Sequence, residues 1–132
     1  MFLDVDTAVG KSKIDGRGVI ALRDFNPGEI VIPWDTSNTL TDAEYERLPE
    51  DQRRYVARYK GEWLYMLEPA RFVNHSCDSN TVPLRGNDVA VREIKAGDEI
   101  TSDYRSVMLS GERMACRCGA QNCMGYIVGI AV

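Results

Sequence analysis

Four cysteines and a single histidine are the residues of this 132-residue chain whose types and spacing most directly suggest chemistry. Cys116, Cys118 and Cys123 share one short glycine-containing segment, and Cys77 lies far upstream, two residues after the histidine. Four thiolates are a standard tetrahedral set for structural zinc. Two disulfides or inert thiols are the alternative, which is weaker for an intracellular chain. The pattern therefore predicts a structural zinc site at Cys77, Cys116, Cys118 and Cys123.

Three further segments carry polar or glycine-rich patterns. Gly16-Arg17-Gly18 lies near the start, residues 74–77 read Asn-His-Ser-Cys, and residues 99–104 read Glu-Ile-Thr-Ser-Asp-Tyr. Glycines allow the backbone to approach a ligand closely, although a simple turn needs the same residues. No nucleophile–base pair is apparent, so the residues do not indicate covalent catalysis. Each segment alone is a weak signal, and their combination, order and spacing carry the inference.

In these motifs the chain resembles the SET-domain protein lysine methyltransferases, including their zinc-binding post-SET tail. The resemblance covers residues 11–127. The family motif Asn-His-Ser-Cys-x-Pro-Asn corresponds to residues 74–80, with Ser79 in place of proline, and Glu-Leu-Thr-x-Asp-Tyr corresponds to residues 99–104. The post-SET motif Cys-x-Cys-x4-Cys corresponds to residues 116–123. The resemblance implies methyl transfer from S-adenosylmethionine to a lysine ε-amine. It also implies a mainly β, β-clip-like fold with short sheets, in which the Asn-His-Ser segment threads through a pseudoknot.

The resemblance assigns roles to particular residues. It implies that Tyr104 is the catalytic tyrosine and that Tyr65 and Ser102 line the lysine channel with it. The cofactor-binding residues that it implies are Gly16, Arg17, Gly18, Asn74, His75 and Tyr126. Ordinary packing in strands or in the core would explain the same tyrosines and the histidine without a ligand. A small Ser102 stands where the family often has Phe or Tyr, so we expect di- or trimethylation.

Methyl transfer to an amine makes demands that these residues can meet. An in-line displacement needs an uncharged amine held behind the methyl group and shielded from water. Free lysine has a pKa of about 10.4 and must lose a proton before it attacks. A nearby sulfonium and a dry channel both disfavour the ammonium form and so lower that pKa.

Composition limits the class of protein and its partners. The chain has 16 Lys and Arg against 20 Asp and Glu, a net charge of −4, which suits a basic protein or peptide partner and argues against direct nucleic-acid binding. No apolar run approaches the ~20 residues of a membrane helix. Residues 1–6 lack the features of a secretory signal. We therefore expect a soluble intracellular protein, cytoplasmic or associated with the nucleus or nucleoid, without membrane partners. The oligomeric state is left open.

Short strands are the elements expected to position the motifs. The sequence predicts strands at residues 18–23, 29–32 and 63–67. Residues 21–28 and 90–97 match position for position, which predicts two paired strand–turn–strand units in one β-rich domain. A turn is expected around residues 85–88.

A helical insert is expected to interrupt these strands over residues 41–60. Thr41 and Glu44 form a capping-box pattern at its start. Pro49 suits the first turn of a second helix, and Tyr55, Val56 and Tyr59 recur at helical spacing.

The resemblance implies a minimal SET domain over residues 1–112 and a zinc-stapled post-SET tail over residues 113–132, which is too short for a core of its own. The expected function is lysine methylation of a histone-like or chromatin protein, or of another basic protein such as a ribosomal protein. Two other classes fit part of the pattern. One is a non-catalytic SET-like module that binds a lysine peptide, and the other is a small structural zinc adaptor. Failure to bind S-adenosylmethionine would favour the first of these.

Overall fold

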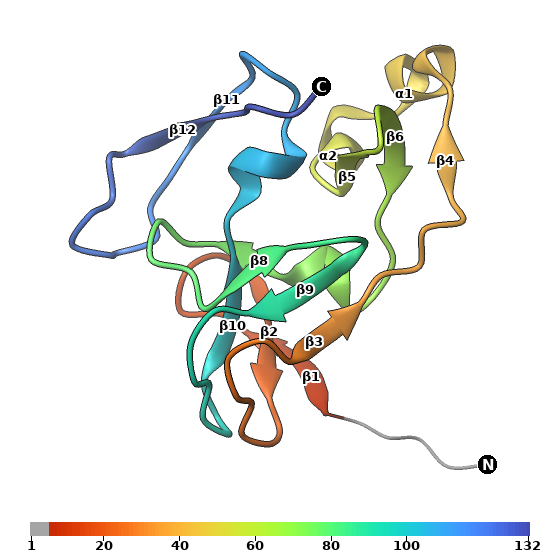
Figure 1. The fold of residues 1–132 in the computed structure, drawn as a ribbon. Helices are drawn as coiled ribbons and strands as arrows, with labels where there is room; N and C mark the ends of the chain where they lie inside the picture. Colours follow the sequence, from red (N-terminus) through yellow and green to blue (C-terminus); the bar gives the residue numbers. More distant parts are fainter. Residues whose placement is uncertain (1–5) are drawn as a thin grey trace.

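The computed structural model describes residues 6–132 and consists mainly of short β-strands in small sheets (Figure 1). The strands are β1 (Thr7–Lys11), β2 (Arg17–Ala21), β3 (Ile30–Pro33), β4 (Thr39–Leu40), β5 (Val56–Tyr59), β6 (Glu62–Tyr65), β7 (Asn74–His75), β8 (Thr81–Pro83), β9 (Asn87–Ala90), β10 (Glu99–Ser102), β11 (Arg113–Ala115) and β12 (Tyr126–Val128). The helices are α1 (Asp42–Arg47), α2 (Glu50–Arg53) and two short 3-10 helices, η1 (Ala70–Phe72) and η2 (Tyr104–Val107). The mainly β fold that the sequence predicted is confirmed.

The two matching segments of the sequence form the centre of the fold. Strands β2 and β3 of the first unit pair with β10 and β9 of the second, so each unit completes the sheets of the other. Phe25 and Ile94 hold the same place in the two units and exchange backbone hydrogen bonds of 2.8 and 2.9 Å. Gly28 and Gly97 end the two turns, and each donates to the alanine carbonyl of the other unit at 2.8 Å. The predicted pairing of the units is confirmed as a local two-fold arrangement.

The main hydrophobic core lies between these units. It consists of Val19, Ala21, Phe25, Val31, Ile32, Val73, Ala90, Ile94 and Ile100. Burial of one large aliphatic or aromatic side chain stabilises a fold by roughly 1.5–3 kcal/mol. Because Ile100 is fully buried, the core fixes strand β10 and the residues that follow it.

Strand β7 brings the Asn-His pair against β10. The two strands run parallel, with Asn74 opposite Thr101 and His75 opposite Ser102. They extend the sheet whose order is β1-β2-β10-β7. Two motifs whose paired residues are 27 positions apart in the sequence therefore lie side by side. The threaded pseudoknot implied by the resemblance stays a prediction.

The insert begins as predicted and ends differently. The side chain of Thr41 accepts from the Glu44 N–H at 3.1 Å, and the Glu44 carboxylate accepts from the Thr41 N–H at 2.9 Å, so the capping box is confirmed. The prediction that residues 56–59 continue the second helix is wrong, since they form strand β5. Lys60 and Gly61 both have positive φ, 51° and 74°, and make a two-residue hairpin turn that pairs β5 with β6.

The turn predicted around residues 85–88 and the tail complete the description of the chain. Arg85 and Gly86 have φ of 52° and 77° and join β8 to β9, so the turn falls within the expected range and Asn87 and Asp88 already belong to the strand. Residues 113–132 carry the β11–β12 hairpin and lie mostly exposed beside the core (Figure 1). None of the helices in residues 6–132 has the length and apolar character needed to cross a membrane. The sequence analysis expected no secretory signal in residues 1–6, and residues 1–5 of that segment lie outside the described residues.

Candidate active site and metal centre

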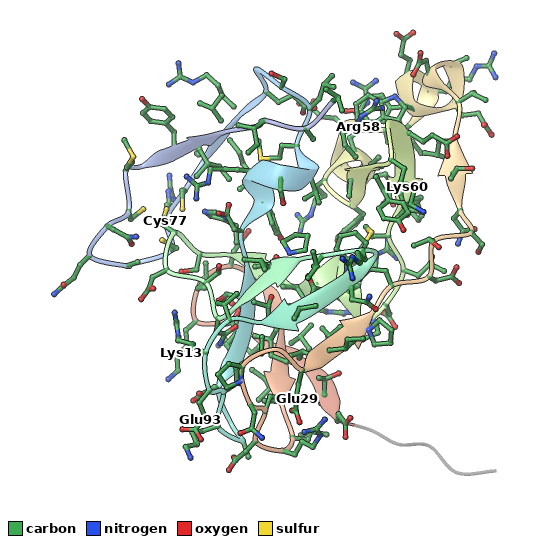
Figure 2. All side chains as sticks on the ribbon, in the orientation of Figure 1. Lys13, Glu29, Arg58, Lys60, Cys77 and Glu93 are labelled. Carbon is green, nitrogen blue, oxygen red and sulfur yellow. The ribbon has the colours of Figure 1, made fainter. Side chains whose placement is uncertain are left out.

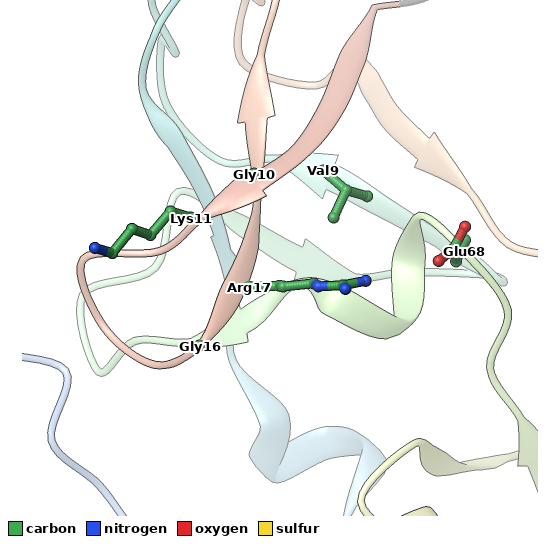
Figure 3. Close-up of a pocket in the computed structure, with 6 residues that line it drawn as sticks. All are labelled: Val9, Gly10, Lys11, Gly16, Arg17 and Glu68. Carbon is green, nitrogen blue, oxygen red and sulfur yellow. The ribbon is translucent and has the colours of Figure 1, made fainter.

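A recess beside strands β1 and β2 contains two of the predicted cofactor-binding residues (Figure 3). It has a volume of about 560 Å³, which lies in the range of small-molecule sites. Its lining consists of Val9, Gly10, Lys11, Gly16, Arg17 and Glu68. The φ of Gly16 is +48°, a conformation that other residues rarely adopt, so glycine is favoured where the loop turns into β2. The structure thus places Gly16 and Arg17 at a cavity.

The side chain of Asn74 holds the loop that leads into this recess. Its Nδ2 donates to the carbonyl oxygens of Asp15 at 3.0 Å and Arg17 at 2.9 Å, and lies 3.0 Å from the Ser12 hydroxyl. The Ser12 hydroxyl in turn donates to Glu99 Oε2 at 2.7 Å. Asn74 therefore fixes the shape of the glycine loop through its amide.

Gly18 has a related role. A Cβ atom at this position would lie 2.6 Å from Glu99 Oε2 and 3.0 Å from the Ser12 Cβ, so a side chain here would displace the Glu99 carboxylate from its contact with Ser12. Sequence reasoning missed both Ser12 and Glu99 as site residues. Glu99 begins the motif at residues 99–104. Ser12 could have been recognised as a turn serine, because its hydroxyl accepts hydrogen bonds from the N–H groups of Ile14 and Asp15.

Tyr104 lies directly after β10, at the start of η2. Its hydroxyl donates to the Val73 carbonyl oxygen, one residue before Asn74. Its backbone N–H donates to Nδ1 of His75 at 3.0 Å. Burial raises the pKa of the Tyr104 phenol, and the nearby carboxylate of Asp88 raises it further. The phenol is therefore protonated at neutral pH and fixed in direction.

His75 connects Tyr104 with the cysteines. Because Nδ1 accepts a hydrogen bond from Tyr104, the neutral ring carries its proton on Nε2. That atom lies 3.6 Å from the sulfur of Cys77. Burial lowers the pKa of His75, which is only 4% exposed, so the ring is neutral at physiological pH. His75 is therefore both a buried core residue and a member of the candidate site.

The four cysteines converge from two distant parts of the chain (Figure 2, where Cys77 is labelled). Their sulfur atoms all lie within 4.8 Å of one another, and the Cys77 and Cys116 sulfurs are 3.7 Å apart. Four thiolates bound to zinc at about 2.3 Å are about 3.8 Å apart, so the spacing fits a tetrahedral ion. All four are free thiols rather than disulfides.

The thiols of this cluster differ in acidity. Burial raises the pKa of Cys116 to about 12. Burial also acts to raise the pKa of Cys118, but hydrogen bonds from the N–H groups of Cys77 and Ala120 outweigh it and lower that pKa to about 6. A ready thiolate at Cys118 favours capture of a cation, which then lowers the pKa of the other thiols. The cluster can hold a metal ion.

The remaining predicted residues lie in different surroundings. The Tyr65 hydroxyl donates to Gln52 Oε1 and accepts from Arg71, both at 2.7 Å. Ser102 is buried on β10. Tyr126 lies on β12, where it is 43% exposed, and its ring packs against the Arg113 guanidinium 4.3 Å from the ring centre. The hydrogen bonds unite the Gly16–Gly18 loop, Asn74, His75 and Tyr104, and Tyr126 stays on the outer face of the tail.

Fold and site together define a small β domain that contains a surface recess, a half-buried tyrosine and a cluster of four thiols that can hold a metal ion. A family model described as the SET domain matches residues 16–105. The chain belongs to the SET-domain family.

Two relatives and one solved structure show the extent of this similarity. Histone-lysine N-methyltransferase ASHR3 of Arabidopsis thaliana is 31% identical over 140 residues, which cover 89% of this chain and 27% of that protein. Histone-lysine N-methyltransferase trithorax of Drosophila virilis is 30% identical over 142 residues, 90% of this chain and 4% of that protein. The chain thus spans only a small part of the length of these relatives.

The solved structure is a humanized mutant of the Chaetomium thermophilum Polycomb Repressive Complex 2 bound to the inhibitor GSK126. Its matching chain is 26% identical with a TM-score of 0.66, and the match covers 79% of this chain and 15% of that one. The similarity supports the arrangement of short sheets described above.

Proposed function

We propose that this chain is a protein-lysine N-methyltransferase that uses S-adenosylmethionine. The observation that carries the proposal is the hydrogen-bonded path from the glycine loop through Asn74 and β7 to His75 and Tyr104. These residues come from distant parts of the chain, and they match the family motifs at every one of these positions. The names of the two relatives, both histone-lysine N-methyltransferases, support the same reaction.

We place the methyl donor at this recess, whose volume of about 560 Å³ lies in the range of small-molecule sites. Gly16 and Arg17 line it, and Asn74 holds their loop in place. When bound there, S-adenosylmethionine supplies an electrophilic methyl group on a sulfonium. The chain contributes binding, orientation and exclusion of water. We include Gly18, His75 and Tyr126 in the proposed cofactor-binding set, with Gly18 and His75 acting through the shape of the loop and of β7.

Tyr104 is the proposed catalytic residue. Its hydroxyl is held by the Val73 carbonyl oxygen and its backbone by His75, so the phenol oxygen is fixed before substrate arrives. A protonated phenol in a buried site offers a fixed dipole to the reacting centre without the cost of reorienting. Tyr65, Ser102 and Tyr104 line the proposed lysine channel, in which the ε-amine loses its proton before it attacks.

The four cysteines form the proposed structural zinc site. Four protein ligands leave no open position, so the ion does not take part in the chemistry. Its effect is on position, because Cys77 follows His75 by two residues and the other three ligands belong to the tail. The ion thereby ties the post-SET tail, residues 113–132, to the strand that supports Tyr104 in the SET domain, residues 1–112.

The proposed substrate is a basic histone-like or chromatin protein, methylated in the nucleus or another intracellular compartment. Both named relatives act on histone lysines by name, and the net charge of −4 favours a basic partner. A ribosomal or other basic protein presents the same chemistry, so a panel of basic proteins is the appropriate first test.

The test is transfer of labelled methyl from S-adenosylmethionine to core histones, with a lysine-free peptide as the negative substrate. We expect Tyr104→Phe to lose activity by a factor on the order of 10²–10³, because one preorganised electrostatic contact is removed. Binding of S-adenosylmethionine, measured by calorimetry, should survive. Tyr45→Phe on α1 removes a hydroxyl outside the site and serves as the matched control.

Two outcomes would count against the proposal. Turnover of Tyr104→Phe equal to that of the wild type would refute the role of the tyrosine. Binding of a lysine peptide without any methyl transfer, in a zinc-loaded wild-type chain, would favour the non-catalytic binding module.

A further inference from the structure

Asp88 is the only buried acidic residue within residues 6–132, with 3% of its surface exposed. It lies on β9, the central strand of the sheet β3-β9-β8, directly opposite the core residue Ile32. Its Oδ2 accepts a hydrogen bond of 3.0 Å from the indole N–H of Trp34. No lysine or arginine of the described chain lies within ion-pair distance of it. A carboxylate thus occupies a core position with one neutral donor.

A second unusual polar group faces Asp88. Ser102 on β10 is 3% exposed, and its hydroxyl acts on the Asp88 carboxylate as a neighbouring donor. The hydroxyl nevertheless has no hydrogen-bond partner that meets normal geometry. Tyr104, two residues further on, feels the negative charge of Asp88, which raises the pKa of its phenol. The carboxylate therefore acts electrostatically on two of the three residues that line the proposed lysine channel.

This arrangement costs stability. Burial raises the pKa of Asp88 to about 6, although the hydrogen bond from Trp34 and the nearby Ser102 hydroxyl act in the opposite direction. A buried carboxylate without a cationic partner is unfavourable, and an apolar residue would suit this position between core strands better. Costly titratable groups that gather at a site point to a role in its chemistry.

We propose that Asp88 is a positioning residue that orients the Ser102 hydroxyl and stabilises the positive charge that forms on the substrate nitrogen. The inference rests on the proposed methyltransferase function. The ε-nitrogen uses its lone pair to form the new N–C bond, while the electron pair of the breaking C–S bond stays on sulfur. Positive charge therefore moves from sulfur to nitrogen as the reaction proceeds.

Asp88 and Ser102 can act together on that charge. The Ser102 hydroxyl donates its proton toward the carboxylate, and its oxygen then accepts from an N–H of the substrate amine. A negative carboxylate behind this serine favours the transition state over the ground state, because the nitrogen is neutral before attack and cationic afterwards. When Asp88 is protonated, its side chain is neutral and no longer stabilises the positive charge on the nitrogen.

The test is the pH dependence of kcat/KM for methyl transfer to core histones between about pH 5 and 9. Because the substrate lysine must lose its proton in both chains, the informative quantity is the ratio of wild-type to Asp88→Asn kcat/KM, which is expected to fall on acidification through about pH 6, where Asp88 takes up a proton. Asp88→Asn keeps the shape and the Trp34 contact. It should lower kcat/KM on the order of 10- to 100-fold at pH 8, and the acid limb due to Asp88 should disappear.

Two further variants and one control variant distinguish a positioning role of Asp88 from a purely structural one. Trp34→Phe removes a donor that lowers the pKa of Asp88, so the acid limb should move to higher pH. Ser102→Ala should shift it in the same direction. Glu93→Gln removes an exposed carboxylate of equal charge and should leave rate and profile unchanged. Binding of S-adenosylmethionine by calorimetry reports that each variant is folded.

The outcomes distinguish the two levels of the proposal. A ratio of wild-type to Asp88→Asn kcat/KM that does not change with pH, in an active Asp88→Asn chain, overturns the role of Asp88 and leaves the methyltransferase function intact. Absence of methyl transfer by the wild-type chain contradicts the proposed function itself.

Discussion

The paired strand units and the C-terminal tail are stabilised in different ways. The units share a continuous apolar core in which Phe25, Ile94 and Ile100 are at most 1% exposed. In residues 113–132 only Cys116, Ile127 and Gly129 are buried, while Met124 and Ile130 are 74% and 70% exposed. The first region is stabilised by packing. The second is joined to the rest by backbone hydrogen bonds to residues 105–112 and by four thiols that can hold a metal ion. From this comparison we infer that the site combines an intrinsically stable half with a half that metal binding stabilises.

The largest expected effect comes from breaking the link between the two regions. Removal of zinc by a chelator, or Cys118→Ser, should abolish methyl transfer, because the tail has too little core to stay docked alone. Hydrogen exchange should show loss of protection in residues 113–132 and retained protection in β2 and β10. Metal analysis should find one zinc per chain before treatment, and added zinc should restore the chelated wild type. An active chain without zinc would contradict this account.

A matched pair of isoleucines tests how packing differs between the regions. Ile100→Ala leaves a cavity in the core and should lower the free energy of unfolding by roughly 2–5 kcal/mol. Ile130→Ala makes the same chemical change at an exposed position in the tail and should change it by less than about 0.5 kcal/mol. Urea titrations followed by tryptophan fluorescence measure both. Equal losses in the two variants would mean that the tail shares the main core.

Asp88 marks a position where the core itself is not optimised for stability. Its pKa of about 6 lies above the usual 3.9 of an unfolded Asp, so the native state binds this proton more tightly. The corresponding stability is fully present below about pH 4 and is lost as pH rises through 6, on the order of 3 kcal/mol. Asp88→Asn should therefore be more stable than the wild type at pH 7, and the advantage should vanish near pH 4. A variant that is less stable at pH 7 would show that the carboxylate supports the fold.

The smallest expected effect concerns the number of methyl groups added. Ser102→Tyr adds a ring and a hydroxyl that can hold a water in the lysine channel, so the product should shift toward monomethyl-lysine. The wild-type chain should reach di- or trimethyl-lysine under exhaustive conditions. Mass spectrometry of a lysine peptide gives the distribution, and S-adenosylmethionine binding checks that the buried ring is accommodated. An unchanged distribution would show that Ser102 does not limit the channel.

Local patterns of the sequence predicted much of this fold. The capping box at Thr41 depends on residues three apart, and it formed as expected. The match between residues 21–28 and 90–97 predicted two paired units, because the same turn chemistry recurs in both. The cysteine spacing likewise predicted the cluster, since few arrangements other than a metal site bring those four residues together.

The remaining features depend on partners that lie far away in the sequence. Tyr55, Val56 and Tyr59 fit helical spacing, and only the Lys60-Gly61 turn with its pairing to β6 makes residues 56–59 a strand. Asp88 was expected in a turn, where aspartate is common, and pairing with β3 buries it instead. Such long-range pairing leaves no periodic signal in the local sequence.

The central claim is that this site transfers methyl groups to lysine. The most direct measurement is mass spectrometry of proteins from a cell extract after incubation with the zinc-loaded chain and labelled S-adenosylmethionine, with Tyr104→Phe as a parallel control. We expect label on lysine ε-amines of basic proteins, with core histones prominent, and almost none with the Tyr104→Phe chain. Label on other residue types, or equal lysine labelling by both chains, would contradict the claim.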